Sequence, residues 1–342
     1  MPNQIIITSQ PEAAVIALNE VQKIYPAARG QRLSQEMQLI TFPDDASALD
    51  ASIAQAIFIR HCFPVQLSTP IDTPKLSQTM ADLCAQFPKD KPFSIQMRCT
   101  DQANKPQALS LIKETEAILQ DEGYIKDDAN PSWAISLVID DNKAVYVGVS
   151  FTSQNLSTWN GGMHRFKRDD SYISRAEFKL LEALSVFSID IPALGAKTAL
   201  DLGAAPGGWT KILLDRGLHV TAVDPANLSE TLQGNSRLEH IQDIAQRLIT
   251  KTSKGAKIKK DPFDILVNDM RMDMMESCKI MLDMTPLLAH AGIAVMTFKL
   301  PHAQWYKNTK RALALLEKSY TVQGARQLFH NRSEVTVWLS IK

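Results

Sequence analysis

The second half of the chain alternates apolar runs typical of strands with stretches that have helical spacing. Strands are predicted at residues 197–202, 219–223, 263–268, 292–298 and 335–341. Helices are predicted at 174–187, 241–250, 276–290 and 307–318. A further helix is predicted to follow the glycine-rich turn at 203–208 and to continue through residue 214. Strands separated by helical stretches predict a doubly wound, mostly parallel α/β sheet of the Rossmann-like kind.

The first half has a mixed α+β pattern in which strands follow one another more closely. Strands are predicted at 4–8, 38–42, 93–99, 134–139 and 143–149, with a further apolar run at 56–65. Helices are predicted at 12–25, 73–87 and 107–119. Asp140-Asp141-Asn142 is typical of a tight turn between the last two strands. Thr158-Trp-Asn-Gly-Gly162 breaks the pattern and is a candidate linker.

Length and charge distribution indicate two domains with different surfaces. At 342 residues the chain exceeds the roughly 250–300 residues at which single cores stop growing. The net charge is zero, but residues 1–163 hold 12 Lys/Arg against 18 Asp/Glu, and residues 164–342 hold 25 against 19. A locally basic half can attract a polyanion even when the whole chain is neutral.

Cysteine usage and hydropathy favour a cytoplasmic protein. The four cysteines, Cys62, Cys84, Cys99 and Cys278, are scattered without a C-x-x-C pair, so we expect no disulfide framework and no metal site. No apolar run approaches the roughly 20 residues of a membrane span, and no signal peptide is evident at the start.

A glycine-rich loop follows the first strand of the second half. Asp201-Leu-Gly-Ala-Ala-Pro-Gly-Gly-Trp209 places three glycines after the strand end, and glycine lets a backbone turn sharply close to a ligand. In an open α/β sheet, ligands bind beyond the carboxyl ends of the strands. Asp224 ends the next strand, where a carboxylate can accept both hydroxyls of an adenosine ribose.

Three interpretations of this loop compete: a structural turn without a ligand, a dinucleotide site and a site for S-adenosylmethionine. Gly203-x-Ala205-x-x-Gly208 is a near miss to the dinucleotide pattern G-x-G-x-x-G. Asp201 would repel a pyrophosphate but can interact with the ammonium group of S-adenosylmethionine, directly or through water, and this acid with Pro206 favours that cofactor. The expected cofactor-binding residues of the loop are Asp201, Gly203, Ala205, Pro206, Gly207, Gly208 and Trp209, with Asp224 beyond it.

Five short blocks of the second half carry a family resemblance. They are Ser174-Arg-Ala-Glu-Phe-Lys-Leu180, Asp201–Thr210, Val267-Asn-Asp-Met270, Phe298-Lys-Leu-Pro301 and Arg332-Ser-Glu-Val-Thr-Val337. In this order they resemble the conserved blocks of FtsJ-type ribose 2'-O-methyltransferases. The resemblance is closest to the RlmM branch of large-subunit ribosomal RNA ribose methyltransferases. It covers about residues 164–342 and is much weaker over residues 1–160.

This resemblance implies both a reaction and a domain plan. The reaction is methyl transfer from S-adenosylmethionine to a ribose 2'-hydroxyl. The resemblance to the RlmM branch implies a cytidine in large-subunit (23S) ribosomal RNA as the target. The resemblance implies a Lys-Asp-Lys-Glu tetrad, which this chain supplies as Lys179, Asp269, Lys299 and Glu334. The implied domains are a ferredoxin-like region at 1–70, a THUMP-like RNA-recognition region at 71–155, a linker at 156–173 and the methyltransferase domain at 174–342.

The chemistry of ribose methylation gives separate support for the tetrad. A ribose hydroxyl is a poor nucleophile, so a base must lie within hydrogen-bond reach of its proton. Lys299, at the carboxyl end of a predicted strand, is the candidate base, although an ordinary lysine with a pKa of about 10.4 is almost fully charged at pH 7. Lys179, the cofactor's positive sulfur and desolvation would lower that pKa. Asp269 and Glu334 would raise it, so we expect these acids to orient the lysines and the substrate.

Two residues have roles with open alternatives, and a third has two roles. Asp243 is a candidate for the adenine amino group by resemblance, or an ordinary aspartate at a helix start. Ser174 either touches the cofactor or caps the helix that follows it. Asp269 is assigned to the cofactor site as well as to the tetrad.

A basic and aromatic segment precedes Lys179. Cations and aromatic rings can grip RNA phosphates and stack on bases. The expected RNA contacts are Arg165, Lys167, Arg168 and Arg175. The alternative is a solvated linker. The first half is net acidic, so any RNA contacts there must form a local patch.

The leading function is methylation of a ribose in ribosomal RNA, and the substrate is either free RNA or a precursor particle. Two other functions stay open. A base methyltransferase acting on an adenine amino group would favour an Asn/Asp-Pro-Pro-Tyr turn, where this chain has Asn268-Asp-Met-Arg271. Cytosine C5 methylation needs a cysteine nucleophile, and Cys278 lies within a predicted helix. A noncatalytic RNA-binding or assembly module with a methyltransferase fold would fail to bind S-adenosylmethionine.

Overall fold

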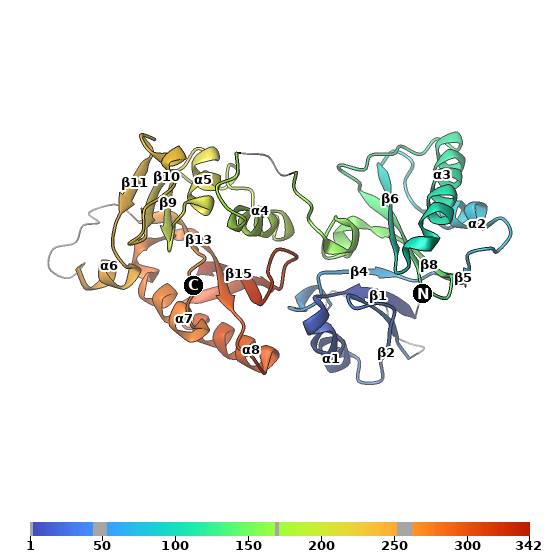
Figure 1. Cartoon of the computed structure of the whole chain (residues 1–342), viewed down its shortest axis with the longest axis horizontal. Coiled ribbons are helices and arrows are strands. Elements are labelled where there is room, and N and C mark those ends of the chain that lie inside the picture. The colour runs from blue at the N-terminus through green and yellow to red at the C-terminus, as the bar shows by residue number, and fades with distance from the viewer. Residues whose placement is uncertain (1–2, 44–52, 168–170, 252–261) are drawn as a thin grey trace. The chain divides into compact units, whose positions relative to one another are not determined.

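The structure is a computed structural model that describes residues 3–43, 53–167, 171–251 and 262–342. It divides into two compact units, Met1–His164 (the first unit) and Arg165–Lys342 (the second unit). Figure 1 shows the labelled elements of both units. Each unit encloses its own apolar core and is described by itself.

One sheet of the first unit is antiparallel throughout, in the order β2-β3-β1-β4. Its elements are β1 (Gln4–Thr8), α1 (Ala14–Ile24), β2 (Arg29–Arg32), β3 (Met37–Thr41) and β4 (His61–Pro64). Ile5, Ile6 and Ile7 in β1 are fully buried, so both faces of this strand are covered. Gln38 Nε2 donates to the carbonyl oxygen of Ala14 at 2.7 Å and ties α1 to the sheet.

The other sheet of the first unit has the order β5-β8-β7-β6, in which only β6 and β7 run parallel. Its elements are β5 (Leu67–Pro70), α2 (Leu76–Asp82), β6 (Phe93–Cys99), α3 (Lys105–Asp121), β7 (Trp133–Ile139) and β8 (Ala144–Phe151). Trp133 is fully buried and stacks on Phe93, with 5.1 Å between ring centroids, in the core shared with α2 and α3. Tyr146 packs with Ile6 and Phe63, so the two sheets share a further cluster.

Residues 158–162, expected as a candidate linker, pack within the first unit. Asn160–Gly162 form a short 3-10 helix, in which Asn160 Nδ2 donates to the carbonyl oxygen of Met97 at 2.9 Å. Thr8 Oγ1 donates to the carbonyl oxygen of Gly161 at 2.9 Å. Gly161 has φ +60, and a Cβ there would lie 2.4 Å from an Arg98 nitrogen. This stretch is therefore packed structure rather than a free connection.

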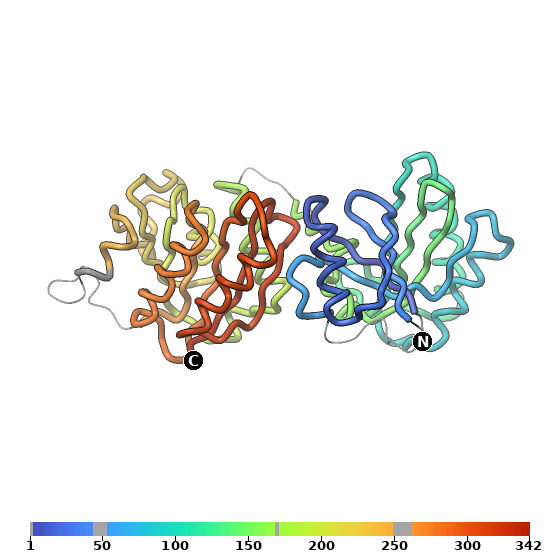
Figure 2. Tube along the Cα trace, turned by 90° about the horizontal axis from the view of Figure 1, so that it is seen from below, coloured from blue at the N-terminus to red at the C-terminus, as the bar shows by residue number. Residues whose placement is uncertain are grey.

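The second unit contains a seven-stranded sheet in the order β11-β10-β9-β12-β13-β15-β14. Its strands are β9 (Thr198–Leu202), β10 (His219–Val223), β11 (Leu238–Ile241), β12 (Phe263–Asn268), β13 (Leu288–Lys299), β14 (Tyr320–Arg326) and β15 (Glu334–Ile341). Only β15 runs against its neighbours, and Figure 2 shows these C-terminal strands in red. The expected mostly parallel, Rossmann-like sheet is confirmed.

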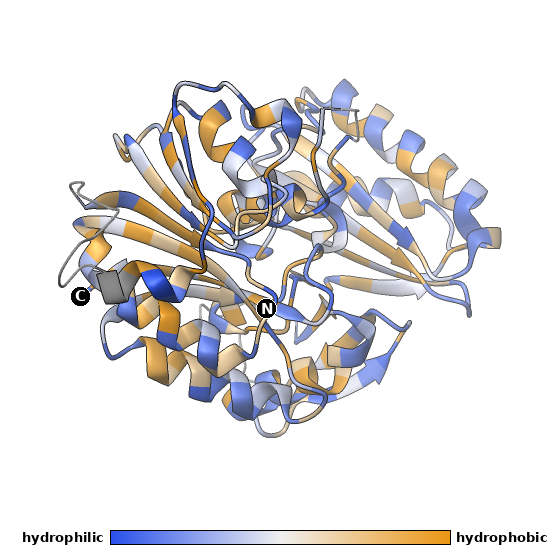
Figure 3. Cartoon of the chain, turned by 60° about the vertical axis from the view of Figure 1, so that its left-hand side comes forward, coloured by the Kyte–Doolittle hydropathy of each residue, from blue (hydrophilic) through white to orange (hydrophobic). Residues whose placement is uncertain are grey.

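Helices cover both faces of this sheet, as Figure 1 shows. They are α4 (Ala176–Val186), α5 (Gly208–Asp215), α6 (Ala245–Lys251), α7 (Met274–Asp283) and α8 (Trp305–Leu316). Helix α4 packs with α5, and α7 packs with α8. Figure 3 shows mostly hydrophobic strands and helices that carry both hydrophobic and hydrophilic residues. Within the described ranges, no helix has the length and apolar character needed to cross a membrane.

The sequence pattern missed strands at sheet edges and misplaced two helix ends. Strands β2, β5, β11 and β14 lie at edges, where a strand has one partner and needs no continuous apolar pattern. The helix expected to begin at Ile241 was wrong at its start, because residues 238–241 form β11 and α6 begins at Ala245. The helix expected at 276–290 ends at Asp283, since Pro286 follows and cannot continue it.

Candidate active site

The charged residues predicted to act together lie at the carboxyl edge of the seven-stranded sheet. Asp201 lies near the end of β9, and Asp224 follows β10 directly. Asp269 follows the last residue of β12, and Lys299 is the last residue of β13. Parallel strands end at the same edge, so residues far apart in the sequence are brought to one side.

The four tetrad residues form one continuous chain of ion pairs. Lys179 Nζ, on α4, lies 3.0 and 3.1 Å from the two carboxylate oxygens of Asp269. The same nitrogen lies 2.7 Å from Glu334 Oε2, and the other oxygen of Glu334 contacts Lys299 Nζ. Lys299 and Glu334 are direct partners in the antiparallel pairing of β13 with β15. The structure therefore brings Lys179 and Lys299 to opposite oxygens of one carboxylate.

Lys299 is the tetrad member best placed to meet a substrate. Its side chain is 34% exposed, against 17% for Lys179, 14% for Asp269 and 7% for Glu334. Burial lowers the pKa of Lys299 to about 8, and the positive charges of Lys179 and Arg271 act in the same direction. The Asp269 carboxylate acts against this shift. The Glu334 carboxylate also favours the charged amine that it contacts.

Thr297 supports Asp269 and was missed by the sequence analysis. It lies two residues before Lys299 in β13, is 1% exposed, and donates its hydroxyl proton to Asp269 Oδ1. Asp269 thus accepts from Thr297 and from Lys179, which fixes its carboxylate. A threonine in an apolar strand carries no sequence signal for this role, because only the pairing of β12 with β13 places it there.

Glu182, one turn after Lys179 in α4, holds the segment that leads into Glu334. It is 1% exposed and accepts from the backbone N–H groups of Phe329 at 2.7 Å and His330 at 2.8 Å. These contacts use both carboxylate oxygens, so α4 positions Lys179 and the approach to Glu334 together. No sequence pattern indicates this role, since an acid within a helix is usually solvated.

The start of α4 lies against the glycine-rich loop. Glu177, buried in α4, accepts from the backbone N–H groups of Ile173 at 2.6 Å and Ser174 at 3.0 Å. Ser174 Oγ accepts from the N–H of Ala176, and it lies 2.5 Å from where a Cβ on Gly208 would stand. Ser174 thus both supports the helix start and borders the loop.

The loop itself forms an open backbone cradle. Gly203 and Gly207 have φ of +70 and +109, a backbone conformation that residues with a side chain rarely adopt. A Cβ on Gly203 would lie 2.3 Å from Met270 Cγ, so only glycine fits beneath the chain that follows Asp269. Asp224 Oδ2 accepts from the N–H of Ala205 at 3.1 Å, which joins the end of β10 to the loop.

Negative charge is concentrated at this cradle. Asp201 is 2% exposed and accepts from Thr210 Oγ1 at 2.6 Å. The pKa of Asp201 is raised to about 7, mainly by burial; the bond from Thr210 lowers it, and the charges of Asp269 and Asp224 add to the rise. A cation would relieve this repulsion, whereas a pyrophosphate would increase it. The residues present therefore fit S-adenosylmethionine, which carries positive ammonium and sulfonium groups.

Two expected cofactor residues have other contacts. Trp209 is 3% exposed within the core, and its Nε1–H donates to the carbonyl oxygen of Ala176 at 2.7 Å. Its indole therefore joins α5 to α4, and only its backbone is left for the cofactor. Asp243, after β11, accepts from the N–H of Ile244 at 2.9 Å and pairs with Arg247 at 3.2 Å.

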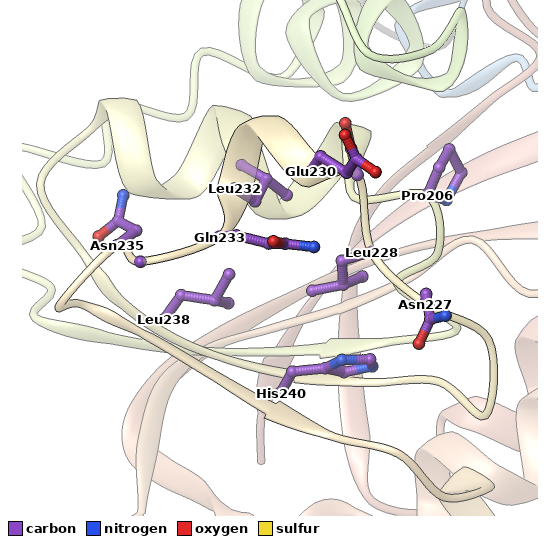
Figure 4. A pocket seen from close by; sticks show the side chains of 11 residues that line it. Pro206, Asn227, Leu228, Glu230, Leu232, Gln233, Asn235, Leu238 and His240 are labelled. Carbon is purple, nitrogen blue, oxygen red and sulfur yellow. The ribbon is translucent and has the colours of Figure 1, made fainter.

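A pocket of about 620 Å³ opens beside Pro206. It is lined by Pro206, by residues 227–230 and 232–235, and by Leu238 and His240 of β11. Figure 4 shows the side chains of Leu228, Leu232 and Leu238 together with polar groups from Asn227, Gln233 and Asn235. His240 also contacts the carbonyl oxygen of Asp224 at 3.1 Å. The tetrad does not line this pocket, which belongs to the Asp224 side of the loop.

The expected RNA contacts lie before α4, with Arg175 directly preceding its first residue. Arg165, Lys167 and Arg175 are exposed. Arg168 lies outside the described residues. Phe166, between the first two, stacks on Phe178 with 5.7 Å between ring centroids, so this aromatic ring packs beside the residue that precedes Lys179.

Comparison with known proteins identifies the family. Residues 172–301 match the family model described as FtsJ-like methyltransferase. The chain is 30% identical over 282 residues to ribosomal RNA large subunit methyltransferase M of Pseudomonas fluorescens Pf-5, covering 78% of this chain and 75% of that protein. The chain therefore belongs to the family of ribosomal RNA large subunit methyltransferase M, which contains an FtsJ-like methyltransferase domain. It is a ribosomal RNA methyltransferase whose methyl donor is S-adenosylmethionine.

Other similarities are more partial. The ribosomal RNA large subunit methyltransferase M of Methylococcus capsulatus is 33% identical to the present chain over 207 residues, covering 58% of this chain and 55% of that protein. The solved structure of TrmN from Thermus thermophilus aligns with 99% of each chain at 12% identity and a TM-score of 0.40.

Acidification should weaken binding of S-adenosylmethionine by this methyltransferase. A cationic ligand favours ionised Asp201, whose pKa is about 7 without it, so binding at lower pH must release a proton. Calorimetry should show the dissociation constant rising by about tenfold per pH unit below 7 and levelling off above it. Asp201→Asn should bind weakly and lose this dependence, whereas Asp215→Asn, at an exposed pair with Lys211, should keep it. An unchanged slope in Asp201→Asn would contradict the assignment.

Replacing Glu182 by Gln should slow catalysis and leave cofactor binding intact. An amide nitrogen would face a backbone N–H, so the segment before Glu334 would shift away from the two lysines. We expect kcat to fall by about 10-fold to 100-fold, the effect of displacing reacting groups by about 1 Å. Glu317→Gln, at an exposed acid after α8, is the matched control. Equal kcat and pH profiles for the two variants would show that Glu182 does not position the tetrad.

Proposed function

We propose that this protein methylates the ribose 2'-hydroxyl of a cytidine in 23S ribosomal RNA, with Lys299 as the base. The observation that carries the proposal is the contact of Lys179 and Lys299 with the two oxygens of Glu334. An amine with a lowered pKa then lies at the carboxyl edge beside the cradle for the methyl donor.

The proposed division of labour follows from the ion pairs. Lys179 contacts both Asp269 and Glu334, so these two acids fix the position of its amine, which attracts the developing negative charge of the ribose oxygen. Lys299 contacts one carboxylate, and burial lowers its pKa to about 8, so its amine gives up a proton and accepts the one from the 2'-hydroxyl. Its partial exposure lets a substrate reach it. Thr297 and Glu182 hold the two acids in place.

The bound cofactor supplies the activated methyl group, and the chain's residues hold it. Asp201 faces its positive end, Asp224 accepts the ribose hydroxyls, and Ser174 borders the loop at Gly208. Asp243 is assigned to the adenine amino group. The backbone of Gly203 to Gly208 surrounds the rest of the ligand.

For the first unit we propose RNA recognition, with a ferredoxin-like region at 1–70 and a THUMP-like region at 71–155. The two four-stranded sheets with helices α1, α2 and α3 support two such regions, with β5 (Leu67–Pro70) already paired in the second sheet. We also propose that Arg165, Lys167 and Arg175 contact the RNA, that the substrate is large-subunit RNA in free or precursor form, and that the protein works in the cytoplasm.

Methylation of a base is not favoured. Cys278, the candidate nucleophile for cytosine C5 chemistry, is fully buried in α7, and burial raises its pKa to about 12. A thiol in this environment does not form the thiolate that attack requires. The turn after β12 presents Asp269 to Lys179 rather than a proline-rich face to a base.

The deciding experiment is transfer of tritiated methyl to ribosomal RNA at defined stages of subunit assembly, followed by nucleoside mass spectrometry. We expect the label on the 2'-oxygen of a cytidine in the large-subunit RNA. A label on a base would overturn the proposal. Failure to bind S-adenosylmethionine, together with no transfer to any RNA, would favour the noncatalytic module.

Lys299→Ala should lose activity and keep the cofactor. A general base contributes about 10²- to 10⁴-fold, so kcat should fall by that factor while calorimetry shows unchanged cofactor binding. The pKa of about 8 predicts that wild-type kcat rises with pH and levels off above about 8, because only the neutral amine accepts a proton. Lys197→Ala, at an exposed lysine before β9, is the control. Near-normal kcat in Lys299→Ala would exclude this base.

A further inference from the structure

One long segment carries the excess positive charge of the second unit. Residues 284–333 contain seven Lys/Arg and a single acid, Glu317. This segment includes Lys299, helix α8 and the approach to Glu334. The basic character of the second half is therefore localised around the base rather than spread over the unit.

Helix α8 presents three of these cations as one stripe. Lys307, Lys310 and Arg311 are exposed, whereas Thr309, Ala312, Leu313 and Leu316 are buried against the unit. Residues spaced by three and four lie on one helix face. The stripe occupies the first two turns of a helix with no acid in its first turn. Lys307 lies in the first turn, where a cation is electrostatically unfavourable, so the helix itself does not account for it.

The stripe begins at the catalytic edge of the sheet. Helix α8 follows β13 after five residues, and Trp305 Nε1 donates to the carbonyl oxygen of Pro301 at 2.7 Å, which folds the connection back. A helix that follows a parallel strand starts at the carboxyl edge, where Lys299 ends β13. Arg271, exposed after β12, is close enough to Lys299 to lower its pKa.

Charge divides this edge into two halves. Asp201, Asp224 and Asp243 lie at the ends of β9, β10 and β11, which form the half that suits a cationic cofactor. The half formed by β13 and α8 carries the cations, and the one acid that β15 adds, Glu334, is paired with Lys179 and Lys299. No large apolar residue of α8 is exposed within the described residues, whereas a helix that lies on a membrane presents an apolar face. A polyanion matches this half, and an apolar partner does not.

We infer that Lys307, Lys310 and Arg311 bind phosphates of the RNA strand on one side of the target nucleotide. This surface is separate from the segment 165–175 and rests on the proposed function. It positions the ribose over Lys299 through backbone charge and reads no sequence, since phosphate contacts carry no base information. Its loss weakens RNA binding and leaves the chemistry of a bound nucleotide unchanged.

The test compares two triple variants of the full chain. Lys307→Gln/Lys310→Gln/Arg311→Gln removes the stripe. Lys197→Gln/Lys318→Gln/Lys342→Gln removes the same charge from exposed positions before β9, after α8 and after β15. Methyl transfer to ribosomal RNA is measured at several salt concentrations, with calorimetry of S-adenosylmethionine and thermal melting of each variant.

We expect the stripe variant to raise KM for RNA by about 10-fold or more at low salt, with kcat and cofactor binding unchanged. The slope of log affinity against log salt should fall by about 2, as for three lost contacts to single-stranded RNA. The control triple should stay within about twofold of wild type. Equal KM and salt slopes for both triples would overturn the inference while wild-type transfer to the ribose leaves the proposed function standing. Absence of transfer by the wild type would instead remove the function.

Discussion

The catalytic half of this protein depends on one carboxylate that two ammonium groups share. Glu334 is nearly buried and contacts Lys179 through one oxygen and Lys299 through the other. A buried carboxylate needs partners, and two lysines side by side need a counter-ion. The arrangement therefore keeps two like charges within one site while the pKa of Lys299 is lowered to about 8.

Three elements, β13, β15 and α4, together position the residues of this contact. The β13–β15 register sets Lys299 opposite Glu334, and α4 brings Lys179 from about 155 positions earlier in the chain. Glu182 then binds the two backbone N–H groups at 329 and 330, so the same helix that carries Lys179 holds the approach to Glu334. A change in the packing of α4 would alter both the lysine and its counter-ion.

The carboxyl edge is also divided by charge in a way that suits two ligands of opposite sign. Acids at the ends of β9 to β11 raise the pKa of Asp201 and favour a cation. Cations around β13 and α8 favour a polyanion. Methyl transfer requires both ligands at once, and their separation along one edge lets each meet a complementary field without competing for the same side chains.

The sequence by itself predicted the sheet class and the glycine-rich loop, because strand periodicity and short motifs are local, and its resemblance to FtsJ-type methyltransferases implied the four tetrad residues. It did not reveal the edge strands β11 and β14, whose apolar pattern is weak because each has a single neighbour. Tertiary structure alone placed Thr297 on Asp269, Glu182 on the segment before Glu334 and the indole of Trp209 in the core. These contacts join residues 28 to 147 positions apart, or turn a side chain inward, and no local pattern encodes such pairings.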